Sequence, residues 1–178
     1  PKPIQRPLPI WIGARGPRAI KFAADQGYHL MATLGPDPVP LYRETLAASG
    51  RDPANFKVAQ LRMVYCAESA DQAWEESQEH LFHILDFYQG VLSQAADVEG
   101  DDQILTVSKP EDLRSAPVAE HLLIGTPTQI AEKFEKFLQD FACTDFIMET
   151  QMPGIDPMKA NRSFELFAKK VMPEFRDA

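Results

Sequence analysis

The feature that most constrains the fold is a repeated unit, in which a short apolar segment leads through a turn into a segment with helical periodicity. The first apolar segment, Leu8 to Gly13, is continuously apolar and includes Trp11. Continuous apolarity is typical of a strand covered on both faces, as in a parallel sheet. Strands that alternate with helices predict an α/β fold with right-handed crossovers. We expect strands over 8–13, 28–34, 56–67 and 145–150.

Capping signals mark the expected helices. Pro17 suits the first position of a helix, and Gly27 suits the residue after its end. Ser69 with Gln72, and Thr126 with the glutamine three residues later, have the spacing of a capping box. Helices are therefore expected from 17 to 26, around 41–47, over 69–95 with a break near Gly90, from 126 to about 141, and over 156–171.

Residues 97–118 interrupt this rhythm, since they are acidic and rich in turn-forming residues, with a short capped helix expected at 108–111. We interpret them as an insertion or a mobile loop within one domain that spans 1–178. Four strands do not close a barrel, whereas eight do over about 250 residues. The 178 residues therefore fit a small open sheet or half of a (β/α)8 barrel. Because the sequence begins at Pro1 in a proline-rich stretch, we expect a piece of a longer protein.

Composition excludes several classes of function. With 26 acidic and 18 basic residues the net charge is −8, which repels phosphate backbones and argues against nucleic-acid binding. No apolar run reaches the roughly 18–20 residues that span a bilayer, so no membrane association is expected. Cys66 and Cys143 lie far apart in apolar stretches, which favours two buried thiols in a cytoplasmic protein.

A candidate anion site follows the first strand. Gly13, Ala14, Arg15 and Gly16 connect that strand to the helix that begins at Pro17. Small residues allow the backbone to approach a ligand, and the start of a helix supplies main-chain N–H groups and partial positive charge. The segment therefore suits a phosphate group. The alternative is an ordinary tight turn with a solvated arginine.

Two further groups of polar residues have both a structural and a functional interpretation. Glu76, His80 and His83 share a helix face, which fits either a metal site or, as we favour, a solvated polar face with no metal. Arg62 lies within an apolar strand and Glu149 near the end of the last strand, so they form either an ion pair or part of a site.

His29, beside an apolar strand, is expected to be a structural, hydrogen-bonded residue. No catalytic residue is identified from the individual residues.

Three segments together resemble the bacterial-luciferase-like flavin monooxygenases. Pro9–Ala19, PIWIGARGPRA, resembles the family pattern P-x-W-I-G-G-S-G-P-x-A. Ile124–Glu132, IGTPTQIAE, resembles the pattern G-T-P-E-x-I-A-E, and Asp145–Met148 matches the final strand. The segments occur in the family's order. The resemblance covers most of the chain but only the C-terminal half of the family's barrel.

The resemblance implies the C-terminal half of a (β/α)8 TIM barrel, with about four parallel strands and flanking helices. It implies reduced FMN, or a deazaflavin in a sister branch, at the carboxyl ends of the strands, and oxidation of a small organic substrate with O2. A flavin reductase is an implied candidate partner. The family's phosphate contacts carry over to Gly13, Ala14 and Arg15, with Gly16 opening the helix.

This sequence departs from the family pattern where Ala14-Arg15 replaces Gly-Ser, so a guanidinium replaces a hydroxyl. Tyr28-His29 likewise replaces a turn that is usually richer in glycine. The half of the family's barrel that supplies most of the flavin-ring site is missing, so we expect this chain alone to be inactive. Two alternatives remain open: a deazaflavin-dependent oxidoreductase, and a non-catalytic half-barrel that forms a homo-oligomer through its open sheet edges.

Overall fold

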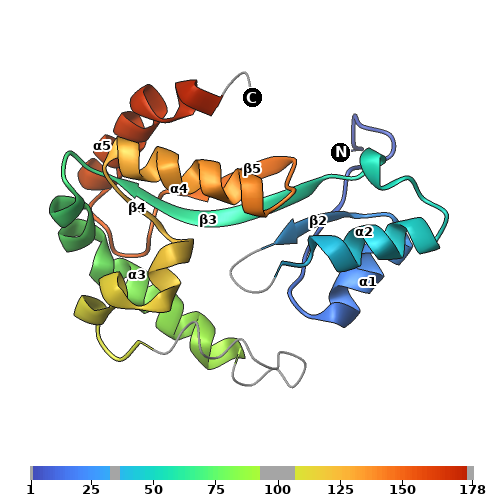
Figure 1. The fold of residues 1–178 in the computed structure, drawn as a ribbon, viewed down its shortest axis with the longest axis horizontal. Coiled ribbons are helices and arrows are strands. Elements are labelled where there is room, and N and C mark those ends of the chain that lie inside the picture. The colour runs from blue at the N-terminus through green and yellow to red at the C-terminus, as the bar shows by residue number, and fades with distance from the viewer. Residues whose placement is uncertain (1, 33–36, 93–106, 176–178) are drawn as a thin grey trace. The chain divides into compact units, whose positions relative to one another are not determined.

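A computed structural model of the chain describes residues 2–32, 37–92 and 107–175. These residues form two compact units, which are described separately. The first contains residues 1–61 and 141–147, and the second contains residues 62–140 and 148–178. The described strands form a five-stranded sheet (Figure 1). Four of them pair in the order β1-β2-β3-β4, and the fifth, β5, pairs with β3. The longest strand, β3 (Val58–Cys66), contributes its first residues to one unit and its later residues to the other.

The first unit repeats a strand–helix pattern. Its elements are β1 (Trp11–Gly13), α1 (Pro17–Gln26), β2 (His29–Ala32), α2 (Val39–Ala48), a short 3₁₀ helix (Pro53–Asn55) and the start of β3. β1 pairs with β2 and β2 pairs with β3 in parallel, with Gly13 opposite Met31 and Ala32 opposite Gln60. The start of β5 (Asp145–Glu149) is joined to β3 by reciprocal hydrogen bonds, because Thr144 N donates to Val58 O at 2.8 Å and Val58 N donates to Thr144 Oγ1 at 2.9 Å.

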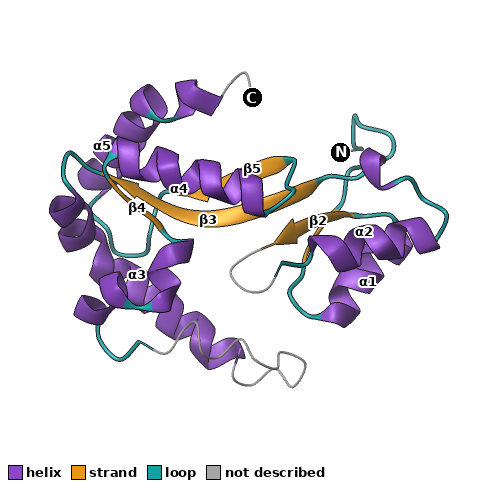
Figure 2. Ribbon diagram, viewed as in Figure 1, coloured by secondary structure: helices purple, strands orange, loops and turns teal. Residues whose placement is uncertain are grey.

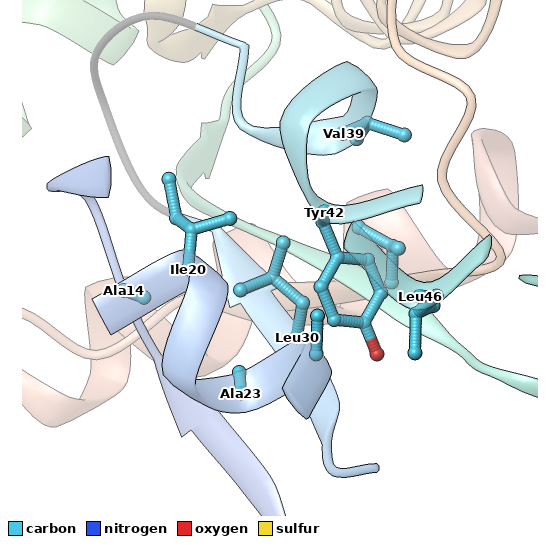
Figure 3. Close-up of a cluster of buried hydrophobic side chains, with 9 residues drawn as sticks. Ala14, Ile20, Ala23, Leu30, Val39, Tyr42 and Leu46 are labelled. Atoms are coloured by element: carbon cyan, nitrogen blue, oxygen red, sulfur yellow. The ribbon is translucent and has the colours of Figure 1, made fainter. Parts of the chain in front are cut away.

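One apolar cluster holds this unit together, as Figure 3 shows. Leu30 and Val58 of the strands pack against α1 and α2, whose buried residues include Ile20 and Tyr42. Ala14, the first residue after β1, belongs to the same cluster. The helices therefore cover one face of these strands, and that face includes the residue that begins the β1–α1 turn.

The second unit is built around the later part of β3 (Figure 2). It contains α3 (Ala70–Leu92), two 3₁₀ helices (Pro110–Ser115 and Pro117–His121), β4 (Leu123–Gly125), α4 (Pro127–Asp140), the end of β5, α5 (Pro157–Lys170) and a final 3₁₀ helix (Met172–Phe175). β4 pairs in parallel with the end of β3, where Val64 lies opposite Leu123.

The predicted parallel sheet with flanking helices is confirmed. β4 was not predicted from the sequence, because its three residues are too few to show strand periodicity and run directly into the capping signal of α4. The predicted break near Gly90 is wrong, because α3 continues through Gly90 to Leu92. Of the predicted insertion 97–118, residues 97–106 lie outside the described residues, and the rest carries the two 3₁₀ helices. None of the described helices is long and apolar enough to cross a membrane.

Candidate functional site

The β1–α1 turn forms as the sequence predicted. Ala14 N donates to Met31 O at 3.2 Å, which extends the pairing of β1 with β2 by one residue. Gly16 then takes an extended conformation as N-cap of α1, with φ −79° and ψ 151°, and its carbonyl accepts from Ile20 N at 3.1 Å. Gly13 is exposed, and a Cβ built on it would lie 3.3 Å from Met31 Cε. A larger residue at this position would therefore need only a small shift of the flexible end of the Met31 side chain.

No side chain of the described residues caps the N-terminus of α1, whose N-cap residue is a glycine. Other helices satisfy their first N–H groups with their own side chains. In α4, Thr126 Oγ1 accepts from Gln129 N at 3.3 Å, and in α5 the carboxylate of Asp156 accepts from Met158 N at 2.8 Å. The uncapped first turn of α1 can therefore offer main-chain donors and the positive end of the helix dipole to an anion.

Arg15 adds positive charge beside this turn. Its side chain is half-buried, and burial lowers the pKa of its guanidinium, which nevertheless stays protonated because an arginine pKa is so high. Arg18, in the first turn of the helix, is exposed. The turn thus combines main-chain donors with two guanidinium groups in one short segment. Groups of these two kinds are able to bind an anion such as a phosphate.

Glu76, His80 and His83, for which a metal site was the less favoured interpretation, have separate surroundings in the structure. The carboxylate of Glu76 accepts hydrogen bonds from Tyr65 Oη and Arg162 NH2, both at 2.7 Å. His80 Nδ1 lies 3.0 Å from Pro153 O, and His83 is exposed. Among the described residues, no three His, Cys, Asp or Glu side chains are grouped so as to hold a metal ion.

Arg62 and Glu149, two candidates from the sequence, have different surroundings. Arg62 is 2% exposed, and its guanidinium carbon lies 5.0 Å from the centre of the Phe137 ring, which is a cation–π contact. Glu149 is half-buried, and burial raises the pKa of its carboxyl. A nearby guanidinium would act in the opposite direction, so the structure gives no support to an ion pair between these two residues.

His29 makes contacts that stabilise the fold. Its Nδ1 accepts from Lys57 N at 3.1 Å, and its ring lies 4.8 Å from the ring of Trp11. These contacts tie β1, β2 and the start of β3 together, as expected for a hydrogen-bonded structural histidine.

Sequence reasoning missed a buried cluster in the second unit. The ring of His121 stacks on that of Phe137 at 6.4 Å, and Lys133 Nζ donates to the carbonyl oxygens of Ala119 and Leu122. His121 Nδ1 is buried and has no hydrogen-bond partner in the described ranges 2–32, 37–92 and 107–175. Burial is the main cause that lowers the pKa of His121, and the positive charge of Arg62 lowers it further. These residues come from two elements, the segment before β4 and α4, and only the fold brings them together, so no local pattern in the sequence indicates the cluster.

The low pKa of His121 predicts that the fold loses stability in mild acid. Glu120 opposes the shift, but Lys133 and Lys136 reinforce it. Because the pKa of His121 in the folded state lies below the ordinary histidine value of 6.5, this stability is fully present above pH 6.5 and falls as the pH drops through the folded-state pKa. His121→Phe, which keeps a stacked ring, is expected to remove this loss. The difference in melting temperature between pH 7.5 and pH 5.5 measures this loss of stability. An unchanged pH dependence in the variant would contradict the prediction.

The chain matches the family model described as luciferase-like monooxygenase over residues 1–144. No match was found among curated proteins. Among solved structures, the chain is similar to the monooxygenase RslO1 from Streptomyces bottropensis, with 20% identity and a TM-score of 0.70 over 98% of this chain and 51% of the other.

Two other solved structures are similar. The first is the oxygenating constituent of 3,6-diketocamphane monooxygenase from Pseudomonas putida, solved with FMN. It has 18% identity and a TM-score of 0.67, over 92% of this chain and 47% of the other. The second is an F420-dependent secondary alcohol dehydrogenase, solved with an F420–acetone adduct. It has 20% identity and a TM-score of 0.68, over 98% of this chain and 51% of the other.

These neighbours are barrel proteins, and the chain spans about half their length. The likeness confirms the expected fold class, an α/β arrangement that corresponds to half of a (β/α)8 barrel. The family model, which matches far more than half of the residues, agrees with the motifs around β1 and β4. On this evidence the chain belongs to the luciferase-like monooxygenase family.

Proposed function

We propose that this chain forms part of a flavin-dependent monooxygenase, and that its β1–α1 turn binds the phosphate of FMN. The observation that carries the proposal is the uncapped N-terminus of α1 beside a half-buried arginine. Gly13, Ala14, Arg15 and Gly16 are the proposed contact residues. Membership of the family, and a structural neighbour solved with FMN, support this choice of ligand.

In this proposal the chain's own residues bind and orient the cofactor. The first turn of α1 donates main-chain hydrogen bonds to the phosphate, and Arg15 adds a charge-assisted contact. Gly13 allows the ligand to approach the backbone at the end of β1. Reduced flavin, when bound, supplies the electrons for the reaction of O2 with a small organic substrate. We assign no catalytic residue to this chain.

A deazaflavin-dependent oxidoreductase is the second candidate. A neighbour solved with an F420 adduct is as similar to this chain as the monooxygenases are. Deazaflavin F420 also carries a phosphate on its side chain, so the same turn would serve either cofactor. The two candidates differ in the flavin ring and in the use of O2, to which the β1–α1 turn does not contribute.

We further propose a cytoplasmic protein that forms homo-oligomers and receives reduced flavin from a reductase. The oligomer has some support in the first unit. Among the described strands β1 pairs with β2 alone, and Trp11 on β1 is 36% exposed. An unpaired strand edge with an exposed aromatic residue favours association with another polypeptide.

Cofactor binding by the full-length protein tests the proposed function. We expect FMN to bind in the micromolar range or tighter, followed by quenching of flavin fluorescence, and F420 to bind much more weakly. Reduced FMN and O2 should then support oxygen transfer to organic substrates. Tight binding of F420 alone would favour the second candidate, and binding of neither cofactor would contradict both.

A further inference from the structure

We propose that Gln60 is a further binding residue for the flavin phosphate, an inference that rests on the proposed function. Gln60 lies on β3 and is 1% exposed. Among the described residues, neither its amide oxygen Oε1 nor its amide nitrogen Nε2 has a hydrogen-bond partner. A buried amide that makes no hydrogen bond costs folding free energy, so a residue of this kind calls for an explanation.

The strand register places Gln60 in line with the β1–α1 turn. Gln60 lies opposite Ala32, the last residue of β2. Ala14 N donates to Met31 O, which in a parallel ladder places Ala14 opposite Ala32. Ala14, Ala32 and Gln60 therefore form one row across three strands at their carboxyl ends. With neighbouring strands about 4.8 Å apart, the Cα atoms of Gln60 and Ala14 are about 10 Å apart.

The side chain of Gln60 lies on the same face of the sheet as the turn. Val58, two residues earlier on β3, packs in the cluster that α1 and α2 cover, and side chains two apart on a strand share a face. Ala14 belongs to that cluster as well. Both residues in line with Gln60 are alanines, so no large side chain of the row separates its amide from the start of α1.

The amide of Gln60 adds an uncharged hydrogen-bond donor to the proposed phosphate site. Its Nε2 has two N–H donors and no positive charge, so it can bind a phosphate oxygen directly or through one ordered water. Main-chain donors of α1 and the guanidinium of Arg15 provide the remaining contacts. Within the part of the chain that the structure describes this amide has no partner, and in the proposal it is satisfied when the phosphate, with any bridging water, is present.

Gln60→Leu tests the inference, because leucine fills a similar volume without polar atoms. In the ligand-free full-length protein we expect the melting temperature to rise by about 2–4 °C, since an unsatisfied amide is removed. We expect the dissociation constant for FMN to rise about tenfold or more, as for a lost hydrogen bond to a charged group. Binding of riboflavin, which has the same ring but no phosphate, should not change.

Ser77→Ala is the matched control. Ser77 is also a buried polar residue, but its Oγ donates to Ala73 O at 2.6 Å. This variant should lower the melting temperature slightly and leave FMN binding unchanged.

Three results would overturn the inference about Gln60. A lower melting temperature of Gln60→Leu would show that the amide is satisfied within the protein by buried water. An equal loss of FMN and riboflavin binding would show a general structural role, and unchanged FMN binding would show no role at all. In these cases the proposed function stands as long as the wild-type protein binds FMN. If the wild-type protein does not bind FMN, the proposed function fails and this inference fails with it.

Discussion

Replacing Gly16 with aspartate is expected to abolish phosphate binding at the β1–α1 turn while leaving the fold at least as stable. The extended backbone of Gly16, with φ −79° and ψ 151°, is accessible to any L-residue. Asp156 caps α5 from a similar conformation, with φ −60° and ψ 121°. An aspartate at position 16 would therefore accept hydrogen bonds from the first turn of α1 and place a negative charge where the phosphate binds.

We expect Gly16→Asp to raise the dissociation constant for FMN about 100-fold or more, because the donors are occupied and the two anions repel each other. Riboflavin binding should stay within about twofold of wild type. Fluorescence titration measures both, and thermal unfolding reports on the fold. Gly16→Asn is the matched control, since it caps the helix without a charge and should weaken FMN binding less. Equal FMN binding by wild type and Gly16→Asp would exclude the turn as the phosphate site.

The second large effect is expected in the second unit, at the carboxylate of Glu76. This carboxylate, with its side chain 12% exposed, accepts from Tyr65 Oη and Arg162 NH2 at 2.7 Å and from Gln72 Nε2 at 3.2 Å. It thereby joins β3, α3 and α5. Glu76→Ala would leave the buried hydroxyl of Tyr65 without its acceptor. We expect a loss of about 2–4 kcal/mol in the free energy of unfolding, with little contribution from the exposed Arg162.

Acid should weaken the same network in the wild-type protein. Burial alone would raise the pKa of Glu76, but the hydrogen bonds from Tyr65, Arg162 and Gln72 outweigh it, so its pKa lies below the ordinary glutamate value of 4.5. The stabilisation is therefore complete above that value and is lost as the pH falls through the folded-state pKa. Chemical denaturation at pH 7 and pH 4 measures the effect. Glu75→Ala, which changes the exposed neighbour on α3, should change the free energy of unfolding at neither pH. A similar loss in Glu75→Ala and Glu76→Ala would contradict the role assigned to Glu76.

The sequence predicts those parts of the molecule whose determinants are local. The turn after β1 and the start of α4 were predicted because glycine, proline and capping residues act within a few positions. Glu76 illustrates the opposite case. On a helix face with two histidines it suggested a metal ligand or a solvated residue, because its partners Tyr65 and Arg162 come from other elements.

Gln60 and β4 show two other limits of prediction. A glutamine in an apolar strand gives no indication whether its amide is paired, because this depends on the residues that the fold places beside it. β4 is recognisable only through its pairing with β3, since three residues carry no periodicity. In both cases the missing information lies in contacts between distant parts of the chain.

The reciprocal hydrogen bonds between Val58 and Thr144 have a consequence for biosynthesis. The first unit needs residues 141–147, which leave the ribosome long after residue 61. At a translation rate of about 5–20 residues per second, β1, β2 and the start of β3 are synthesised several seconds before residues 141–147. During that interval the edge of β3 is open to intermolecular pairing, so nascent chains of this protein should depend on chaperones that shield exposed strands.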